Sequence, residues 1–486
     1  MDFIQANLID PVNKALYTYI LVYLLVAVGI YFTIRTRFVQ FRYFPRMLKQ
    51  LVHSRSHDPG ISPFQAFCVG LASRVGTGNI AGVAIALTVG GPGAIFWMWV
   101  VALIGMATAL IEATLGQIFK VRAGDGTFRG GPAFYIQRGL GSRAGGVVFA
   151  LLLVFAFGFA FNMVQANAIA DVLNASYEVE VQYTTIGLVL LAAPVLFGGV
   201  RRVARVAEIV LPLMALAYVA LALVIIVLHV NYLPEMFKQI IGGAFGLTEM
   251  AGGFTGGIAA AMLNGVKRGL FSNEAGMGSV PNVAATATVS HPVKQGLIQS
   301  LGVFVDTMLI CTATAFIILV SGPEIYDPSQ PTKMAGASLT AAAVASGLGA
   351  WTTWLMTVLV FVFAFSSVLG NYVYAEVNLF YLGARNGTIT GFRMAVLAGI
   401  AIGGLAALDA VWDLADVAMG LMAIVNLTAI VLLGRWALAA LRDFARQADQ
   451  GRDPVFIAED AGLPGHLDGD IWNRPRQTVP EKEVSA

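Results

Sequence analysis

Charged side chains are scarce in this 486-residue chain. Asp, Glu, Lys and Arg together make up 12% of it, about half of the share of about 25% that is typical of a soluble domain. Hydrophobic residues make up 57%, and the mean hydropathy is +0.75. So few charges cannot cover the surface of a water-soluble protein, which excludes a soluble enzyme, a disordered chain and a nucleic-acid binder. The composition predicts a polytopic protein surrounded by membrane lipid.

Residues that build metal centres and catalytic sites are also few. The two cysteines, Cys68 and Cys311, lie far apart in apolar stretches, so we expect neither a disulfide nor a cysteine metal site. The five histidines form no HExxH motif, and no set of nucleophile, base and acid is visible. The chain is therefore not expected to be an enzyme or to need a cofactor. Its first residues carry aspartates and no basic stretch, which argues against a cleaved signal peptide and predicts an N-terminal anchor helix.

Long apolar segments are abundant instead. A helix needs about 20 apolar residues to cross a bilayer, and about eleven segments approach that length. They lie near 15–34, 62–90, 93–120, 145–174, 183–200, 205–231, 236–266, 295–321, 350–383, 391–409 and 412–433. The predicted fold class is an all-α polytopic membrane protein with about eleven transmembrane helices.

Basic residues gather in alternate loops. They follow the first, third, fifth, seventh, ninth and eleventh segments, whereas the loops between carry acids such as Glu178, Glu324 and Asp409. Because Lys and Arg are enriched in cytoplasmic loops, the N-terminus is predicted outside and the C-terminus in the cytoplasm. The polar tail from about residue 443 has few large apolar residues and is predicted to be mobile cytoplasmic chain.

Glycine-rich sequence interrupts two of the apolar segments. The second contains Val-Gly-Thr-Gly-Asn at 75–79, and the seventh contains Gly-Gly-Phe-Thr-Gly-Gly at 252–257. Gly, Thr and Asn are poor helix formers, and unwound backbone within a bilayer is tolerated only where it lines a cavity or packs inside protein. For either motif alone, glycine-mediated helix packing is the alternative. Two interruptions at matching positions instead indicate a transporter binding site.

The spacing of the two interruptions organises the chain. They lie five segments apart, which divides segments two to eleven into five plus five, and an odd number of helices inverts the second half. We therefore predict an N-terminal helix with a basic cytoplasmic linker (1–58), a first five-helix repeat (59–232), a second five-helix repeat (233–435) and a cytoplasmic tail (436–486).

Five stretches of the sequence resemble the alanine/glycine:cation symporter family. They are SRVGTGNIAGVAIALTVGGPGAIFWMWV (73–100), GGPAFYI (130–136), KRGLFSNEAGMGS (267–279), QGLIQSLGVFVDT (295–307) and FAFSSVLGN (363–371). The resemblance covers about residues 15–435. It implies a leucine-transporter-like fold in the plasma (inner) membrane of a bacterium, and uptake of small neutral amino acids driven by sodium or protons. Alanine and glycine are the usual substrates of the family, and some members take glutamine.

An amino-acid substrate needs donors for its carboxylate and acceptors for its ammonium group. The half-helix that begins near Asn79 exposes unpaired N–H groups, and Thr77 and Gly78 add further donors. The resemblance supports Gln165, in the fourth segment, as an amide donor; a helix–helix hydrogen bond is the alternative. The ammonium group is expected to meet free carbonyls of the second break, from about Gly252 to Thr255, and the Thr255 hydroxyl, while Phe254 forms a wall of the pocket.

Sodium prefers oxygen ligands. In the leucine-transporter fold, an adjacent pair of hydroxyls such as Ser366 and Ser367 meets carbonyls of the first broken helix, which here extend from Ala72 to Val75. The alternative is that both hydroxyls bond back to their own helix. Asp306 lies near the centre of the eighth segment with no basic residue near it in sequence, so it is expected to bind a second cation or carry a proton; a structural acid is the alternative.

Charged residues also flank the two breaks. Lys267, Arg268 and Glu274 are predicted to form an inner gate of paired charges at the cytoplasmic end of the seventh segment, with a capped helix end as the alternative. Arg74, next to the first break, is expected to form a gate salt bridge or to snorkel toward the interface; contact with the substrate carboxylate is the alternative.

One position departs from the family. The family carries a tryptophan after the Ser/Thr pair, where this chain has Asn371, four residues after Ser367 and on the same helix face. An amide in place of an indole would enlarge the pocket and make it polar, which favours a larger amino acid such as glutamine or asparagine as the alternative substrate. The sequence also leaves open a channel or a non-transporting sensor on the same fold.

Overall fold

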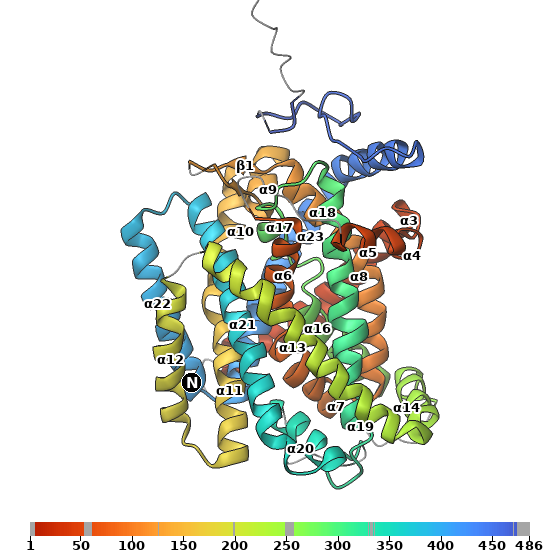
Figure 1. The fold of residues 1–486 in the computed structure, drawn as a ribbon, viewed down its shortest axis with the longest axis vertical. Coiled ribbons are helices and arrows are strands. Elements are labelled where there is room, and N and C mark those ends of the chain that lie inside the picture. The colour runs from red at the N-terminus through yellow and green to blue at the C-terminus, as the bar shows by residue number, and fades with distance from the viewer. Residues whose placement is uncertain are drawn as a thin grey trace, which may run out of the picture.

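Helices make up almost all of the regular structure in this computed structural model, with a single two-stranded hairpin among the described residues (Figure 1). The structure describes residues 5–52, 61–124, 126–197, 200–247, 257–328, 330, 334, 336–469 and 471–473. In these residues, eight helices are long and apolar enough to cross a membrane, and a pair bent by 48° makes a ninth crossing. The prediction of an all-α polytopic membrane protein is confirmed.

Each of the eleven predicted segments contains helix. In chain order they are Asp10–Arg35 (α2, η2 and α3), Pro63–Arg74 with Gly78–Gly90 (α6, then η3 and α7), Gly93–Ile118 (α8), Arg143–Tyr177 (α10, η4 and α11), Val181–Leu196 (α12), Val200–Leu228 (α13), Leu233–Phe245 with Gly257–Asn273 (α14 and α16), Pro292–Leu319 (α18, η6 and α19), Thr352–Tyr381 (α21), Asn386–Leu405 (α22) and Leu408–Asp449 (α23).

The short elements mark the two ends of the helical bundle. The tail end, at the top of Figure 1, carries α5 (Phe44–Val52), the hairpin of β1 (Val121–Arg122) and β2 (Phe128–Arg129), and α9 (Pro132–Leu140). The chain that follows α23 also lies there. The opposite end, which we call the α20 end, carries α14 and α20 (Ala337–Leu348).

Two broken crossings run antiparallel through the centre. The first starts at the tail end, where Thr288 N, just after α17 (Pro281–Ala284), donates to Ile61 O at 3.2 Å. It ends at the α20 end, where Gly90 packs against Ala260 near the start of α16. The second crossing, α16 with α17, therefore runs in the opposite direction, which is the relation expected between two inverted halves.

The second broken crossing has an interruption that was not predicted. After Asn273 the backbone leaves the helix, with φ of +56° at Glu274, +89° at Gly276 and +83° at Gly278. The predicted interruption at 252–257 lies outside the described residues, except for Gly257, which begins α16. The observed break is thus inside the NEAGMGS motif, and the crossing extends beyond the predicted end at residue 266.

The tail also differs from the prediction. Helix α23 continues to Asp449, so the predicted boundary at 435/436 falls inside a helix. The following residues fold back over the tail end, where Phe456 N donates to Ser290 O at 2.8 Å and Trp472 Nε1 donates to Gln117 O at 3.1 Å. Both aromatic rings are buried. The prediction of mobile chain from residue 443 is therefore wrong for the described part of this segment, because two well-spaced aromatic anchors suffice to hold polar sequence.

Truncating the second anchor should release the tail. Trp472→Ala removes the hydrogen bond to Gln117 and the ring contact with Phe456, whose centroid is 5.4 Å away. We expect the docking of the chain after α23 to weaken by about 1–2 kcal/mol, measured as faster hydrogen exchange at the amide of Ala458, which donates to Trp472 O at 3.0 Å. Trp354→Ala, which truncates a 56%-exposed tryptophan, is the control; equal exchange in the two variants would contradict the anchoring role.

Candidate functional site

The first break lies between two helices whose ends follow from the local sequence. Helix α6 begins with a capping box, in which Ser62 Oγ accepts from Gln65 N at 3.1 Å and Gln65 Oε1 accepts from Ser62 N at 3.0 Å. The helix ends at Arg74, because Val75 adopts φ −78° and ψ 88° and Gly76 follows it. Helix resumes in η3 (Gly78–Gly82) and α7 (Val83–Gly90). The predicted break is confirmed, although its non-helical part is shorter than expected.

Backbone donors at the first break already have side-chain partners. Gly76 N donates to Asn79 Oδ1 at 2.9 Å, and Thr77 N donates to Gln165 Oε1 at 3.3 Å. Gln165 thus lies at the break, as predicted, but its oxygen accepts rather than its amide donating. The buried hydroxyl of Thr77 has no hydrogen-bond partner among the residues described. An orphan buried hydroxyl beside these amides is a ready contact for a small polar ligand.

Of the two serines, Ser367 reaches the first broken helix. Its Oγ donates to Ala72 O at 2.9 Å and lies 3.1 Å from Phe363 O of its own helix. Ser366 Oγ bonds back to Phe363 O, at 2.9 Å, as expected for a serine that serves only its own helix. A Cβ on Gly76 would lie 2.1 Å from Ser367 Oγ, so glycine is required for the close approach. Ala72, Ser367 and the break therefore form one oxygen-lined junction.

Asp306 forms a second polar cluster on the same break. It lies fully buried on the π-helical turn η6 (Phe304–Cys311), and its carboxylate accepts from Asn79 Nδ2 at 2.7 Å, Ser272 Oγ at 2.8 Å and Thr307 Oγ1 at 2.8 Å. No Lys or Arg of the described residues forms an ion pair with it. No local pattern singles out Ser272 and Thr307, although both lie inside the family-like motifs.

Glu274 and Asn371 meet in the middle of the bundle. Ser73 Oγ lies 2.7 Å from Glu274 Oε1 and 2.8 Å from Asn371 Oδ1, and Asn371 Nδ2 donates to Asn162 Oδ1 at 2.9 Å. Asn371 thus faces the first break, as the helix-face argument predicted, but both ends of its amide have protein partners. Glu274 lies beside it, and not at the tail end of the bundle.

The predicted position of Lys267 and Arg268 is wrong. Lys267 Nζ lies 3.0 Å from Asp416 Oδ2, and Arg268 Nη2 donates to the same oxygen. Asp416 is eight residues into α23, whose first residues are at the α20 end. Because α16 enters from the α20 end, this ion pair lies in the half of the bundle opposite to the tail. A gate formed by this ion pair would close the side away from the chain that follows α23.

Lys267 should contribute to stability through its ion pair with Asp416. Lys267→Met keeps the Arg268–Asp416 bond but loses one ion pair and the contact of Nζ with the ring of Tyr17, 4.7 Å away. We expect a loss of about 1 kcal/mol, seen as a lower Tm of the purified protein. Lys238→Met removes a 70%-exposed lysine paired with Glu235 at 3.6 Å and should leave Tm unchanged. An equal change of Tm in the two variants would show that the ion pair with Asp416 stabilises the protein no more than an exposed ion pair does.

Arg74 is buried and bonds to backbone. It is 2% exposed, and its Nη1 donates to Gln299 O at 3.1 Å. Within the part of the chain that the structure describes, it forms no salt bridge, and its Nε and Nη2 have no hydrogen-bond partner. The expected salt bridge and the expected snorkelling are therefore wrong, because the partner is a backbone carbonyl of α18 that no local pattern reveals. The alternative, a contact with the substrate carboxylate, stays a prediction.

An aromatic stack covers the first break on its α20 side. The rings of Phe161 and Phe271 are parallel within 8° at 4.5 Å, and Phe271 contacts Trp412 at 4.6 Å. Phe271 also packs against Gly78. These three aromatic residues were not predicted, although Phe161 lies one helical turn before Gln165 and so shares its face. The stack separates the polar break from the α20 end.

Comparisons with known proteins agree with this architecture. Residues 1–458 match the sodium:alanine symporter family. The chain is 45% identical over 477 residues to the amino-acid carrier protein AlsT of Bacillus subtilis (strain 168), covering 98% of this chain and 100% of that protein. It is 46% identical over 477 residues to the probable sodium/glutamine symporter GlnT of the same organism, covering 97% of each.

More distant matches extend the comparison. The chain is 37% identical over 453 residues to the sodium/alanine symporter AgcS of Methanococcus maripaludis, covering 91% of this chain and 98% of that one. A crystal structure of a manganese transporter from Eremococcus coleocola superposes with a TM-score of 0.50 at 14% identity, covering 78% of this chain and 79% of that one. At this identity, the likeness shows the fold alone.

Proposed function

Because the chain belongs to the sodium:alanine symporter family, we propose that it is a secondary active symporter for a small neutral amino acid, alanine or glycine. Entry of sodium drives the uptake, and the protein works by alternating access. The observation that carries the proposal is the junction at the first break, where the Ala72 carbonyl and the Ser367 hydroxyl meet beside Gly76. Carbonyls freed by a broken helix together with a hydroxyl are ligands that suit sodium.

The substrate binds at the two breaks. Its carboxylate takes hydrogen bonds from Thr77, Gly78 and Asn79 at the start of the second half-helix, where the helix dipole favours an anion. The orphan hydroxyl of Thr77 and the amide of Gln165 lie at this position. The predicted acceptors for the ammonium group, Gly252, Phe254 and Thr255, lie outside the described residues. The unwound segment at 274–278 is a second source of carbonyl oxygens.

Sodium couples the two helices that it touches. An ion held by Ser366 or Ser367 together with Ala72 and Val75 bridges α21 and the end of α6, and so orders the break at which the substrate binds. Asp306 binds a second cation or carries a proton, and its three donors keep the carboxylate in place at the same break. The affinity of the amino acid thereby depends on the cation, as thermodynamic linkage requires.

Sidedness follows from the loops. Arginines and lysines concentrate at the tail end, so we assign this end to the cytoplasm and the α20 end to the outside of a bacterial inner membrane. The N-terminus is then outside. In this orientation the aromatic stack and the Lys267–Asp416 pair close the outer side.

Glutamine is the second candidate substrate. The polar Asn371 stands near the break where the family carries tryptophan, and one relative is named as a probable sodium/glutamine symporter. A longer polar side chain would replace the contacts that Asn371 makes with Ser73 and Asn162.

Uptake into proteoliposomes tests the proposal. Radiolabelled alanine is added with and without an inward sodium gradient, and unlabelled glycine, glutamine and asparagine serve as competitors. Sodium-dependent alanine uptake that glycine blocks and glutamine does not is the expected result. Little alanine uptake with strong glutamine uptake would favour the second candidate, and ion flux without saturation would instead indicate a channel.

A further inference from the structure

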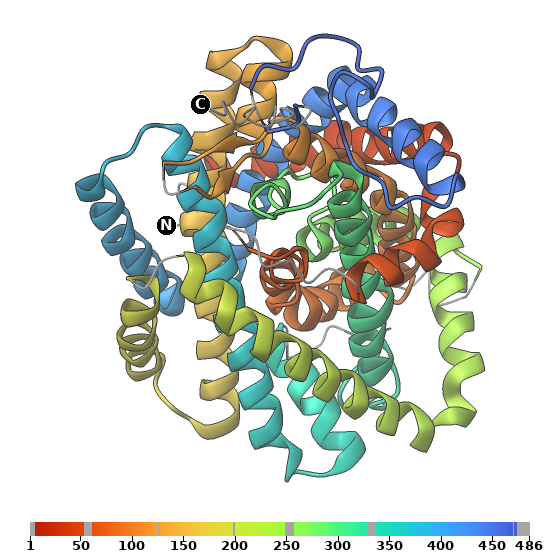
Figure 2. The ribbon, with the colours of Figure 1, turned by 45° about the horizontal axis from the view of Figure 1, so that its top comes forward.

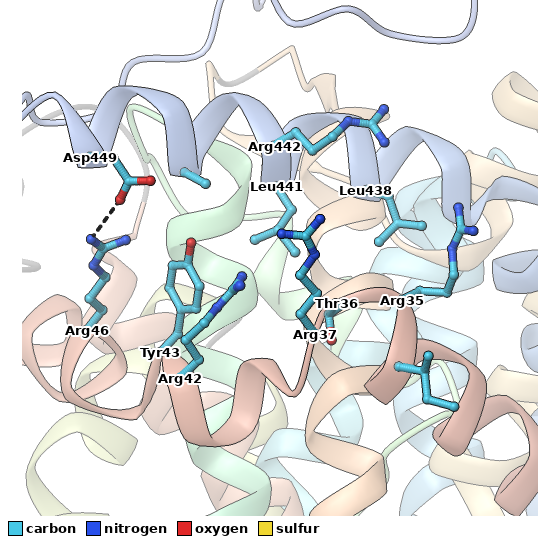
Figure 3. A pocket seen from close by; sticks show the side chains of 12 residues that line it. Arg35, Thr36, Arg37, Arg42, Tyr43, Arg46, Leu438, Leu441, Arg442 and Asp449 are labelled. Carbon is cyan, nitrogen blue, oxygen red and sulfur yellow. Dashed lines mark hydrogen bonds and ion pairs between the residues drawn. The ribbon is translucent and has the colours of Figure 1, made fainter.

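A basic hollow lies at the tail end, between the chain that follows the first crossing and the last turns of α23 (Figure 3). In Figure 2 the blue end of α23 runs beside the red segment that contains α4 (Val39–Arg42) and α5. The hollow has a volume of about 680 Å³, and its floor includes the buried side chains of Tyr43 and Leu441. We call it the arginine hollow, after the residues that line it: Arg35, Arg37, Arg42, Arg46 and Arg442.

The positive charge of this hollow is poorly compensated. Asp449 is the acid among its lining residues, so five arginines face one carboxylate. Its Oδ1 lies 3.4 Å from Arg46 Nη2, and the two side chains are 71% and 39% exposed, so this ion pair is weak. A second hollow of about 240 Å³ shares Arg35 and Arg442 and adds Arg435. Like charges this close repel one another unless an anion lies between them.

The local fold holds the guanidinium groups toward one space. Arg37 and Phe38 both adopt left-handed backbone conformations, with φ of +55° and +56°, which is rare for residues other than glycine. This turn redirects the chain from the end of the first crossing into α4. The guanidinium groups of Arg42 and Arg46 each lie 4.9 Å from the centre of the Tyr43 ring. A guanidinium stacked in this way keeps its N–H edge available for an anion.

Apolar side chains surround the hollow. Ile34, Phe38 and Phe41 are 60%, 53% and 61% exposed, and they lie where the first crossing ends at Arg35. Arg46 and Lys49 are three residues apart on one face of α5, and the apolar Met47 and Leu48 lie between them, as in a helix that lies in the membrane interface. A soluble anion would make no contact with these apolar side chains, whereas the acyl chains of a lipid would pack against them.

We infer that the arginine hollow binds a phospholipid with two phosphate groups, of the diphosphatidylglycerol class, from the leaflet at the tail end. Arg42 and Arg46 beside Tyr43 bind one phosphate, and Arg37 and Arg442, further along the hollow, bind the other (Figure 3). Guanidinium groups bind phosphate oxygens in pairs, which favours arginine at such a site. The lipid thereby joins the first crossing to α23. The inference does not depend on which amino acid the protein transports.

Native mass spectrometry of the full-length protein tests this assignment. The purified protein is given equal amounts of diphosphatidylglycerol, phosphatidylglycerol and phosphatidylcholine with matched acyl chains. The wild type should retain one diphosphatidylglycerol in preference to the others. The triple variant Arg37→Gln, Arg42→Gln and Arg442→Gln should bind it at least about tenfold more weakly.

A matched variant controls for total charge. Arg205→Gln, Arg385→Gln and Arg452→Gln also remove three exposed arginines, but none of them lines the hollow. This variant should retain the lipid as the wild type does, and both variants should have the wild-type Tm in lipid-free detergent. Equal loss of lipid in the two variants would overturn the assignment. So would a rise in Tm with inorganic phosphate equal to that with the lipid, because the site would then take a soluble anion.

Discussion

Asp306→Asn will abolish sodium-driven uptake, with a loss of about 100-fold or more, equivalent to about 2.8 kcal/mol at about 1.4 kcal/mol per tenfold. The carboxylate accepts three hydrogen bonds, from Asn79, Ser272 and Thr307, and it is fully buried. Asparagine has nearly the same shape but no charge, and its NH₂ group would face donors where the carboxylate accepts. In its proposed role, Asp306 would then no longer bind the second cation or carry the proton, while the helices keep their packing. The measurement is initial uptake of alanine into proteoliposomes across a sodium gradient.

An acid away from the breaks provides the control. Asp171 lies near the α20 end of α11 and accepts from Ser338 N at 3.2 Å. Asp171→Asn removes one negative charge as Asp306→Asn does, and it should keep most of the uptake. A strong response of the residual uptake to sodium in Asp306→Asn would show that this carboxylate is structural and that another group carries the coupling.

Gly76→Ala will abolish uptake to a similar extent, although the protein still folds. The new Cβ would lie 2.1 Å from Ser367 Oγ and 3.1 Å from Ser367 Cβ. Because a hydroxyl is the end of a mobile side chain, it would rotate away and give up its hydrogen bond to Ala72 O. We expect about a 100-fold lower uptake and a far higher sodium concentration for half-maximal activity. Monodisperse elution and a nearly unchanged Tm would show that the fold survives.

A glycine of the same broken helix is the matched control. A Cβ on Gly82 would lie 3.5 Å from the Trp412 ring, which is an ordinary van der Waals contact. Gly82→Ala should therefore transport nearly as the wild type does. Ser367→Ala should reproduce the defect of Gly76→Ala, since both remove the hydroxyl from Ala72. Normal sodium dependence in Ser367→Ala would place the cation elsewhere.

Features that depend on local sequence could be predicted. The first break needed only the helix-breaking tendencies of Gly76, Thr77 and Gly78 in an apolar segment, and the same argument placed Gln165 and Ser367 near it once the family fold was assumed. The face of Asn371 followed from its spacing to Ser367. The position of the break and the face of Asn371 require no knowledge of the side chains that pack against the two segments.

Features that depend on residues far apart in the sequence could not be predicted. Lys267 and Arg268 looked like the cytoplasmic flank of a helix, because their partner Asp416 is 148 residues from Arg268 in the sequence. Because the predicted seventh segment ends just before Lys267 and Arg268, Gly276 and Gly278 lay outside that segment and were not recognised as a break. Similarly, the tail docks through Phe456 and Trp472. The overall composition of the tail is polar, so an argument from composition does not detect two single aromatic anchors.

Arg74 also constrains how the chain is synthesised. Its acceptor Gln299 is made 225 residues later, and Glu274, the partner of the adjacent Ser73, 201 residues later. At about 5–20 residues per second, α6 waits about 10–45 s before this acceptor leaves the ribosome. An unpaired arginine at the centre of a helix opposes insertion by about 2.5–3.5 kcal/mol. Insertion of the first half should therefore be less favourable by about this amount until the second half arrives, and a chain that stops near residue 232 should insert less completely than the full chain.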